Sequence, residues 1–179
     1  MPDQDPTPSV LKGLAGLNED EYGANYRSHV LDIYKLYVEM ADRISKRRQA
    51  ANSFFLALNS AMIAAAEYVR LGDKTLSTAA FYSAIGFAGT ILCYQWYRLI
   101  RSYKDLNSGK FKVVQAIEAQ LPLKAYYAEW DALGRDERAD LYLPFTKIEL
   151  RVPWVFMAIH ILVILNSIPL NMLVGTASC

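Results

Sequence analysis

The sequence has few of the residues on which a catalytic or metal-binding site depends. Its 179 residues include two cysteines, Cys93 and Cys179, and two histidines, His29 and His160. Two isolated cysteines provide neither a disulfide framework nor the paired spacing of a metal site. No nucleophile, phosphate-binding or metalloprotease motif occurs. We therefore predict that the protein is not an enzyme and holds no metal or cofactor.

Excess charge of one sign is also missing, because the formal net charge is only +1. Nucleic-acid binders usually carry a strong basic excess, so we expect no nucleic-acid partner. The charges are nevertheless unevenly placed. None follows Arg151, and none lies between Arg48 and Glu67 or between Lys74 and Arg98. The opening "MPDQDPTPSV" is acidic and rich in proline, so we expect a flexible tail without a cleavable secretory signal.

Each uncharged stretch is close to the ~20 residues that a helix needs to cross ~30 Å of hydrocarbon. A soluble protein would not separate charged from apolar residues so strongly, so the sequence predicts membrane spans over 50–69, 78–97 and 153–174. Small residues share one face of the second span and would let it pack closely on the first. These helix-packing residues are Ala79, Ser83, Gly86, Thr90 and Cys93.

Helical periodicity outside the spans completes an all-α prediction. Asn18 and Glu21 have the spacing of a capping box. The helix after them has a wide apolar face, which fits docking on its own subunit or contact with another subunit. Beyond 97, the second span continues as a stalk that we expect to end at "NSG", residues 107–109, before another helix over 110–120. A short aromatic helix follows near 126–133, and the acidic residues around it, Glu118 included, are expected to be solvated.

The predicted organisation has five parts. They are a flexible tail over 1–24, a cytoplasmic amphipathic helix over 25–49, a two-span transmembrane hairpin over 50–97, a cytoplasmic helical region over 98–151, and a third transmembrane helix with a short external C-terminus over 152–179. Lys and Arg favour the cytoplasmic side of membrane proteins. Seven precede the first span and ten lie from Arg98 through Arg151, so the N-terminus is predicted to be cytoplasmic. The juxtamembrane basic residues are Lys46, Arg47, Arg48, Arg98 and Arg101.

Polar side chains inside the predicted spans are the candidate functional residues. Such groups normally face another helix or a wet cavity. They therefore fit either hydrogen bonding between helices or the lining of a pore. In a ring of subunits, an acidic side chain would favour cations. The candidates are Asn52, Asn59 and Glu67 in the first span, and His160, Ser167 and Asn171 in the third.

Longer segments carry a resemblance to a known family. "WYRLIRSYKDLNSGKFKVVQAIEAQLP", "YYAEW" and "TKIELRVPWVF" resemble the RipA family of octameric bacterial membrane proteins, and "YKLYVEMADRISKRRQAANSFFLALNSA" fits the same pattern. The likeness covers roughly residues 26–163 and implies a homo-octamer in the bacterial inner membrane, with no catalytic residues to transfer. A second resemblance is to the SLATT membrane effectors, which have a helix, a two-span hairpin and a cytoplasmic helical tail, although the third span departs from that plan.

Two functions follow as expectations. The first is a non-enzymatic, oligomeric inner-membrane scaffold or regulator whose cytoplasmic face meets another protein or membrane lipid. The alternative is a channel or membrane-permeabilising effector of a bacterial stress or defence system. A continuous water-filled path through the oligomer would favour the channel, and an apolar axis would favour the scaffold.

Overall fold

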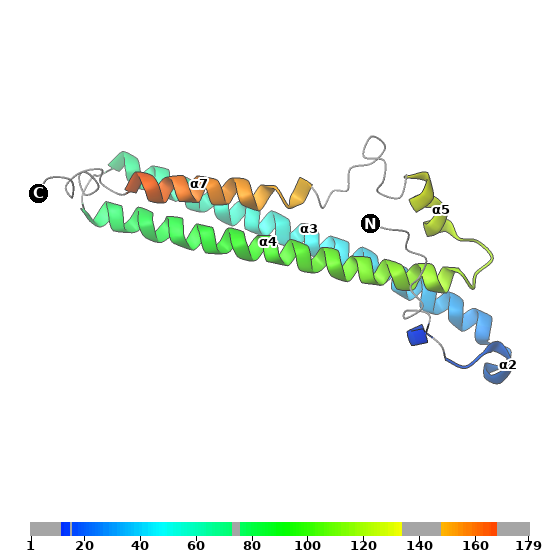
Figure 1. The fold of residues 1–179 in the computed structure, drawn as a ribbon. Helices are drawn as coiled ribbons and strands as arrows, with labels where there is room; N and C mark the ends of the chain where they lie inside the picture. The colour runs from blue at the N-terminus through cyan, green and yellow to red at the C-terminus, as the bar shows by residue number, and fades with distance from the viewer. Residues whose placement is uncertain (1–11, 15, 73–75, 134–147, 168–179) are drawn as a thin grey trace, which may run out of the picture. The chain divides into compact units, whose positions relative to one another are not determined.

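A computed structural model describes residues 12–14, 16–72, 76–133 and 148–167. The regular elements within these ranges are helices, which confirms the predicted all-α class. Figure 1 labels them, and their bounds are α2 (Glu19–Tyr22), α3 (Tyr26–Gly72), α4 (Leu76–Glu118), α5 (Ala125–Ala132) and α7 (Val152–Ser167). The predicted external C-terminus, Cys179 and the candidate residue Asn171 lie outside the described residues.

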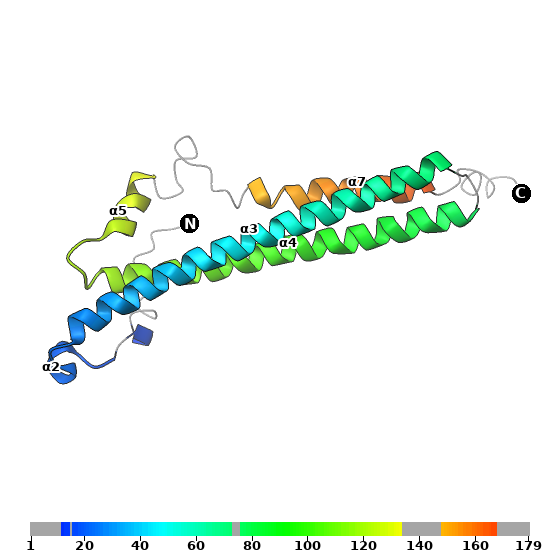
Figure 2. The same cartoon turned by 180° about the vertical axis from the view of Figure 1, so that it is seen from behind.

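The chain divides into two compact units. The first unit comprises Met1–Arg48 and Ser102–Phe145, and the second comprises Gln49–Arg101 and Thr146–Cys179. Both α3 and α4 therefore contribute one part to each unit. In the second unit, α7 lies alongside these helices in both views of the chain (Figures 1 and 2).

α3 is one helix of 47 residues, where the sequence predicted a cytoplasmic helix and a separate span. No proline and no internal glycine interrupts it before its last residue, Gly72. Ion pairs one turn apart, Arg43–Glu39 and Lys46–Asp42, both at 2.7 Å, support it through the basic segment. The predicted boundary at 49/50 is therefore not a break in the backbone.

α4 corrects another sequence prediction, because it runs through "NSG" without ending. A glycine inside a helix costs only about 1 kcal/mol relative to alanine. Gly109 is exposed and has nothing within 4 Å of its missing side chain, while Val114 and Ile117 beyond it are buried. The apolar face on both sides outweighs the local cost, and the helix ends only at Glu118.

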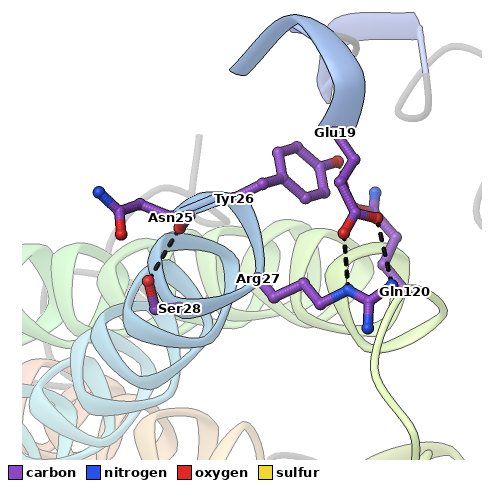
Figure 3. A network of polar contacts seen from close by, with 6 residues as sticks. All are labelled: Glu19, Asn25, Tyr26, Arg27, Ser28 and Gln120. Atoms are coloured by element: carbon purple, nitrogen blue, oxygen red, sulfur yellow. Dashed lines mark hydrogen bonds and ion pairs between the residues drawn. The ribbon is translucent and has the colours of Figure 1, made fainter. Parts of the chain in front are cut away.

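The junction before α3 is held by polar contacts (Figure 3). The capping box predicted at α2 is confirmed, since the Asn18 side chain accepts from the Glu21 N–H at 2.9 Å and Glu21 accepts from the Asn18 N–H at 3.3 Å. Arg27 donates to Glu19 at 2.8 Å, and the Tyr26 hydroxyl donates to Gln120 at 3.2 Å. Part of the predicted flexible tail, residues 19–22, is therefore a capped helical turn.

Within the described residues, none of the helices has both the length and the apolar character that a membrane crossing requires. This finding does not bear out the three spans predicted from the sequence. α7, for example, is described for 16 residues. At 1.5 Å per residue that is about 24 Å, against about 30 Å of hydrocarbon. The rest of the predicted third span, residues 168–174, lies outside the described part of the chain.

Candidate functional site

Three helices of the second unit bring polar side chains together in the interior. Asn59 on α3, Cys93 on α4 and His160 on α7 are each 0% exposed. The Oδ1 atom of Asn59 lies 3.2 Å from the Cys93 Sγ and 3.0 Å from the His160 Nε2. We name these three residues the Asn59 cluster, in which one amide oxygen joins all three helices.

The orientation of the Asn59 amide follows from its other contact. Its Nδ2 donates to the Phe55 carbonyl oxygen at 2.8 Å. A carbonyl oxygen can only accept, so the atom facing it must be the NH₂ group. The Asn59 oxygen then faces Cys93 and His160, and both must donate to it. In a neutral ring, His160 therefore carries its proton on Nε2.

The second nitrogen of His160 marks a close approach of α7 to α4. Its Nδ1 is buried and has no hydrogen-bond partner within the described structure. A Cβ added at Gly89 would overlap the His160 ring, so the ring lies directly against the glycine backbone. At Gly86, an added Cβ would meet the Ile164 side chain and would lie 3.1 Å from the His160 carbonyl oxygen. Two glycines of α4 thus let α7 pack closely enough for His160 to reach Asn59.

Further polar contacts join the same helices. Trp96 on α4 donates to the Asn52 Oδ1 at 2.9 Å, and its ring stacks on Phe55 with centroids 5.8 Å apart. Ser83 on α4 and Ser167 on α7 share a hydrogen bond of 2.9 Å. Of the polar residues predicted on the first and third spans, Asn52, Asn59, His160 and Ser167 are therefore hydrogen-bonded between helices. Glu67 lies exposed on α3.

The small-residue face of α4 packs against α7 as well as against α3, which holds the first predicted span. The sequence predicted that Ala79, Ser83, Gly86, Thr90 and Cys93 pack the hairpin against the first span. In the structure, Ser83 and Gly86 face α7, while Cys93 bonds to Asn59 on α3. Thr90 donates to its own helix, at the Gly86 carbonyl oxygen (2.8 Å), and Ala79 is half-buried. This face of α4 therefore divides between two helices.

Gly89 was missed by the sequence analysis, although a signal for it exists. It lies three residues after Gly86 and four before Cys93, so it shares their side of the helix. Its partner His160 lies 71 residues away. The periodicity could have included Gly89 in the face, but it could not have shown which side chain needs the space.

The predicted basic residues lie near the change from one unit to the other. Lys46 is paired with Asp42, and Arg47, Arg98 and Arg101 are exposed. Arg48 is half-buried. Within the described residues, no group of three or more His, Cys, Asp or Glu side chains is placed to hold a metal ion.

Comparison with known families matches residues 31–169 to the octameric membrane protein family (8xMP). The chain belongs to this family. No curated protein and no solved structure matches it. The 8xMP match confirms the predicted membrane class and the resemblance to an octameric family. The RipA name and the SLATT likeness stay predictions.

The first unit of this 8xMP chain contains a second buried polar site, around Glu118. The Glu118 side chain is 1% exposed, which contradicts its expected place on a solvated surface. Its carboxylate accepts from the Tyr34 hydroxyl at 3.1 Å and from the backbone N–H groups of Tyr126 (2.9 Å) and Tyr127 (3.1 Å). Burial, reinforced by the Glu118 carboxylate, raises the pKa of Tyr34 to about 12.

Glu118 caps the short helix α5 from outside that helix. The N-cap residue of α5, Lys124, makes no side-chain capping bond, and Glu118 accepts from two N–H groups of the first turn instead. A carboxylate at a helix N-terminus is also favoured by the helix dipole. The rings of Tyr34 and Phe111 contact Tyr126, with centroids 6.5 and 5.7 Å away. In this 8xMP chain, Glu118 therefore sets the position of α5 on α3 and α4.

Proposed function

We propose that the protein is a non-enzymatic membrane scaffold that assembles from eight copies in the inner membrane of a bacterium. The second unit lies in lipid, which contacts residues of 50–69, 78–97 and 153–174. The first unit stands in water on the cytoplasmic side, where it meets other proteins or lipid headgroups. The excess of Lys and Arg before residue 49 and from Arg98 through Arg151 supports this orientation.

The distribution of polarity in the second unit carries the proposal. Its interior holds Asn59 and His160, while Phe87, Ile91 and Leu162 are 59%, 62% and 57% exposed. Monomeric soluble proteins rarely expose contiguous apolar patches of large extent. In lipid, by contrast, polar groups must find their partners inside the protein. Apolar side chains outside and a hydrogen-bonded cluster inside suit a lipid solvent.

The same cluster favours a scaffold over a channel. The sequence offered Asn59 and His160 as possible pore-lining groups. In the structure the Asn59 oxygen accepts from two partners, its NH₂ group donates to Phe55, and both residues are 0% exposed. These groups hold helices of one subunit together, so they are not available to water or ions. A channel would have to be lined by other residues, of which Glu67 is the acidic candidate.

Labelling from within the bilayer tests the membrane placement. A phospholipid with a photoactivatable group on its acyl chain is activated in vesicles that contain the intact protein. We expect labelled peptides to include Phe87, Ile91 and Leu162, whereas peptides from residues 26–48 stay unlabelled. Labelling of 26–48 alone, or of no peptide, would overturn the assignment of the second unit to lipid.

Conductance separates the scaffold from the channel. The protein is inserted into planar bilayers after its octameric mass has been verified, and current is recorded across voltage and pH. We expect no current. Cation-selective current that Glu67→Gln makes less selective would establish the channel and overturn the scaffold.

A further inference from the structure

The first unit has two exposed apolar surfaces that its own fold does not cover. The first, which we name the α3 stripe, consists of Ile33, Leu36 and the half-buried Met40. The second, the α5 patch, consists of Leu123, Tyr127 and Trp130, at steps of four and three. Ile33 and Leu36 are 48% and 51% exposed, and Leu123 is 79% exposed.

The α3 stripe lies in a part of the chain that charged residues keep in water. Ion pairs follow one another along the neighbouring side of the helix, Lys35–Asp32 at 3.4 Å, Arg43–Glu39 at 2.7 Å and Lys46–Asp42 at 2.7 Å. Their side chains are all more than half exposed. Hydrocarbon would not accept this many charges. The exposed apolar side chains beside them therefore indicate a protein partner, since such patches mark interaction sites.

The α3 stripe lies on a different side of α3 from the one that meets α5. Tyr34 points toward α5, because its hydroxyl donates to Glu118 and its ring contacts Tyr126. With 3.6 residues per turn, the residues of the α3 stripe lie about 100–160° around the helix from Tyr34. The α3 stripe is therefore directed away from the side of α3 on which α5 is seated.

Two separate apolar surfaces on each subunit suit a closed ring. In a cyclic octamer each subunit meets its neighbours through two different surfaces, which must be complementary to each other. Both surfaces here are apolar, so the one can cover the other.

We propose that the α5 patch of one subunit docks on the α3 stripe of the next, and that eight such contacts close the ring. This inference rests on the octamer of the proposed function.

The docking proposal also assigns a role to Glu118 as a positioning residue. α5 has eight residues, fewer than an isolated helix needs to be stable in water. Glu118 caps it from α4 and so holds the α5 patch in the place where the next subunit meets it.

Cysteine cross-linking tests the contact directly in the full-length protein. Trp130→Cys and Leu36→Cys are combined in one chain, in a Cys179→Ser background that keeps the buried Cys93, and membranes are treated with a short bismaleimide. We expect a ladder of covalent multimers up to eight subunits. Each single variant should give no ladder, and coexpression of the two single variants should give dimers only, because each chain then has one reactive side.

Lys35→Cys in place of Leu36→Cys is the matched control, since Lys35 is exposed one residue away on the charged side of α3. Equal ladders from both pairs, or no ladder from the Leu36 pair while the parent protein keeps its octameric mass, would overturn the docking proposal alone. A parent protein that is monomeric in lipid would overturn the proposed octamer together with it. As a second measurement, Leu36→Glu should shift the mass in detergent from octamer toward smaller species, and an unchanged octamer would contradict the proposal.

Discussion

The two units share α3 and α4 but place polar and apolar side chains in opposite ways. The second unit buries Asn59 and His160 among its helices and exposes large apolar residues on all three. The first unit buries Ala41, Ile44 and Val114 and carries its ion pairs on the outside. Since the backbone of both is continuous helix, secondary structure does not distinguish them. The difference lies in where the side chains are placed.

The first unit also deviates from its own pattern in two places, and both are informative. Glu118 is a buried acid, but it accepts three hydrogen bonds and so keeps α5 in place. The α3 stripe is apolar and exposed, although it adjoins charged residues. In the second unit, the proposed contact with lipid would account for the exposed apolar residues. In the first unit, the same observation underlies the proposed contact between subunits.

The largest effect that we expect comes from filling the space beneath His160. Gly89→Leu would push α7 away from α4 and break the bond between His160 and Asn59, so the free energy of unfolding should fall by about 3 kcal/mol. Ala88→Leu is the control, because Ala88 is exposed one position away. Thermal unfolding of the detergent-purified protein measures the difference. Equal, small losses for the two variants would mean that α7 does not pack on this face.

Replacing Asn59, which accepts both hydrogen bonds of the Asn59 cluster, should have the next largest effect on the free energy of unfolding. Asn59→Leu keeps the volume similar but leaves the Cys93 thiol and the His160 N–H buried without an acceptor, which should destabilise the protein by about 2–3 kcal/mol. Asn52→Leu, which loses one bond to the Trp96 indole, should cost about 1 kcal/mol. If Asn52→Leu proved the more harmful of the two, the cluster would not be the main polar contact of the second unit.

A change at Glu118 should act on the first unit alone. Glu118→Gln removes the charge that strengthens its hydrogen bonds, at a cost of about 1–2 kcal/mol. Amide hydrogen exchange should rise in α5 and remain unchanged in α7. Glu129→Gln, at an exposed position on α5, should leave both helices as they were. Faster exchange in α7 would show that the units do not respond separately.

The smallest effect concerns pH. Burial and the neighbouring Glu118 raise the pKa of Tyr34 to about 12, from about 10 in an unfolded chain. The folded state therefore favours the neutral phenol. The neutral Tyr34 phenol contributes fully to the free energy of unfolding below pH ~10, and this contribution is lost as the pH rises toward ~12. The difference in unfolding free energy between the parent and Tyr34→Phe should thus shrink between about pH 10 and about pH 12. A constant difference would show that Tyr34 titrates as an ordinary tyrosine.

The helices of this protein could be predicted from local pattern, because apolar periodicity extends over many residues of α3 and α4. Their limits could not always be predicted. "NSG" contains a strong local signal for an end, yet Gly109 costs little when apolar residues on both sides stay buried. Local preference is thus a weak guide where a long apolar face continues.

The candidate site was accessible to sequence reasoning only in part. Asn59 and His160 stood out because polar side chains are rare in apolar stretches, but their contact joins residues 101 positions apart. Glu118 gave no such signal, since an acid in a charged segment looks solvated. Its burial depends on Tyr34, 84 residues away, and on the first turn of α5. A single sequence does not record contacts of this range.

The buried thiol of Cys93 can be used to measure how the helices of the second unit open. Its thiol is 0% exposed and is bonded to Asn59 between α3 and α4, so a reagent can reach it only while these helices stand apart. The rate at which an excess of reagent consumes the thiol then equals the intrinsic reaction rate multiplied by the fraction of time spent open. The reaction of one native side chain therefore reports the fraction of time for which the helices are apart. Changes of detergent, lipid or temperature would be recorded as changes in the half-life of this thiol.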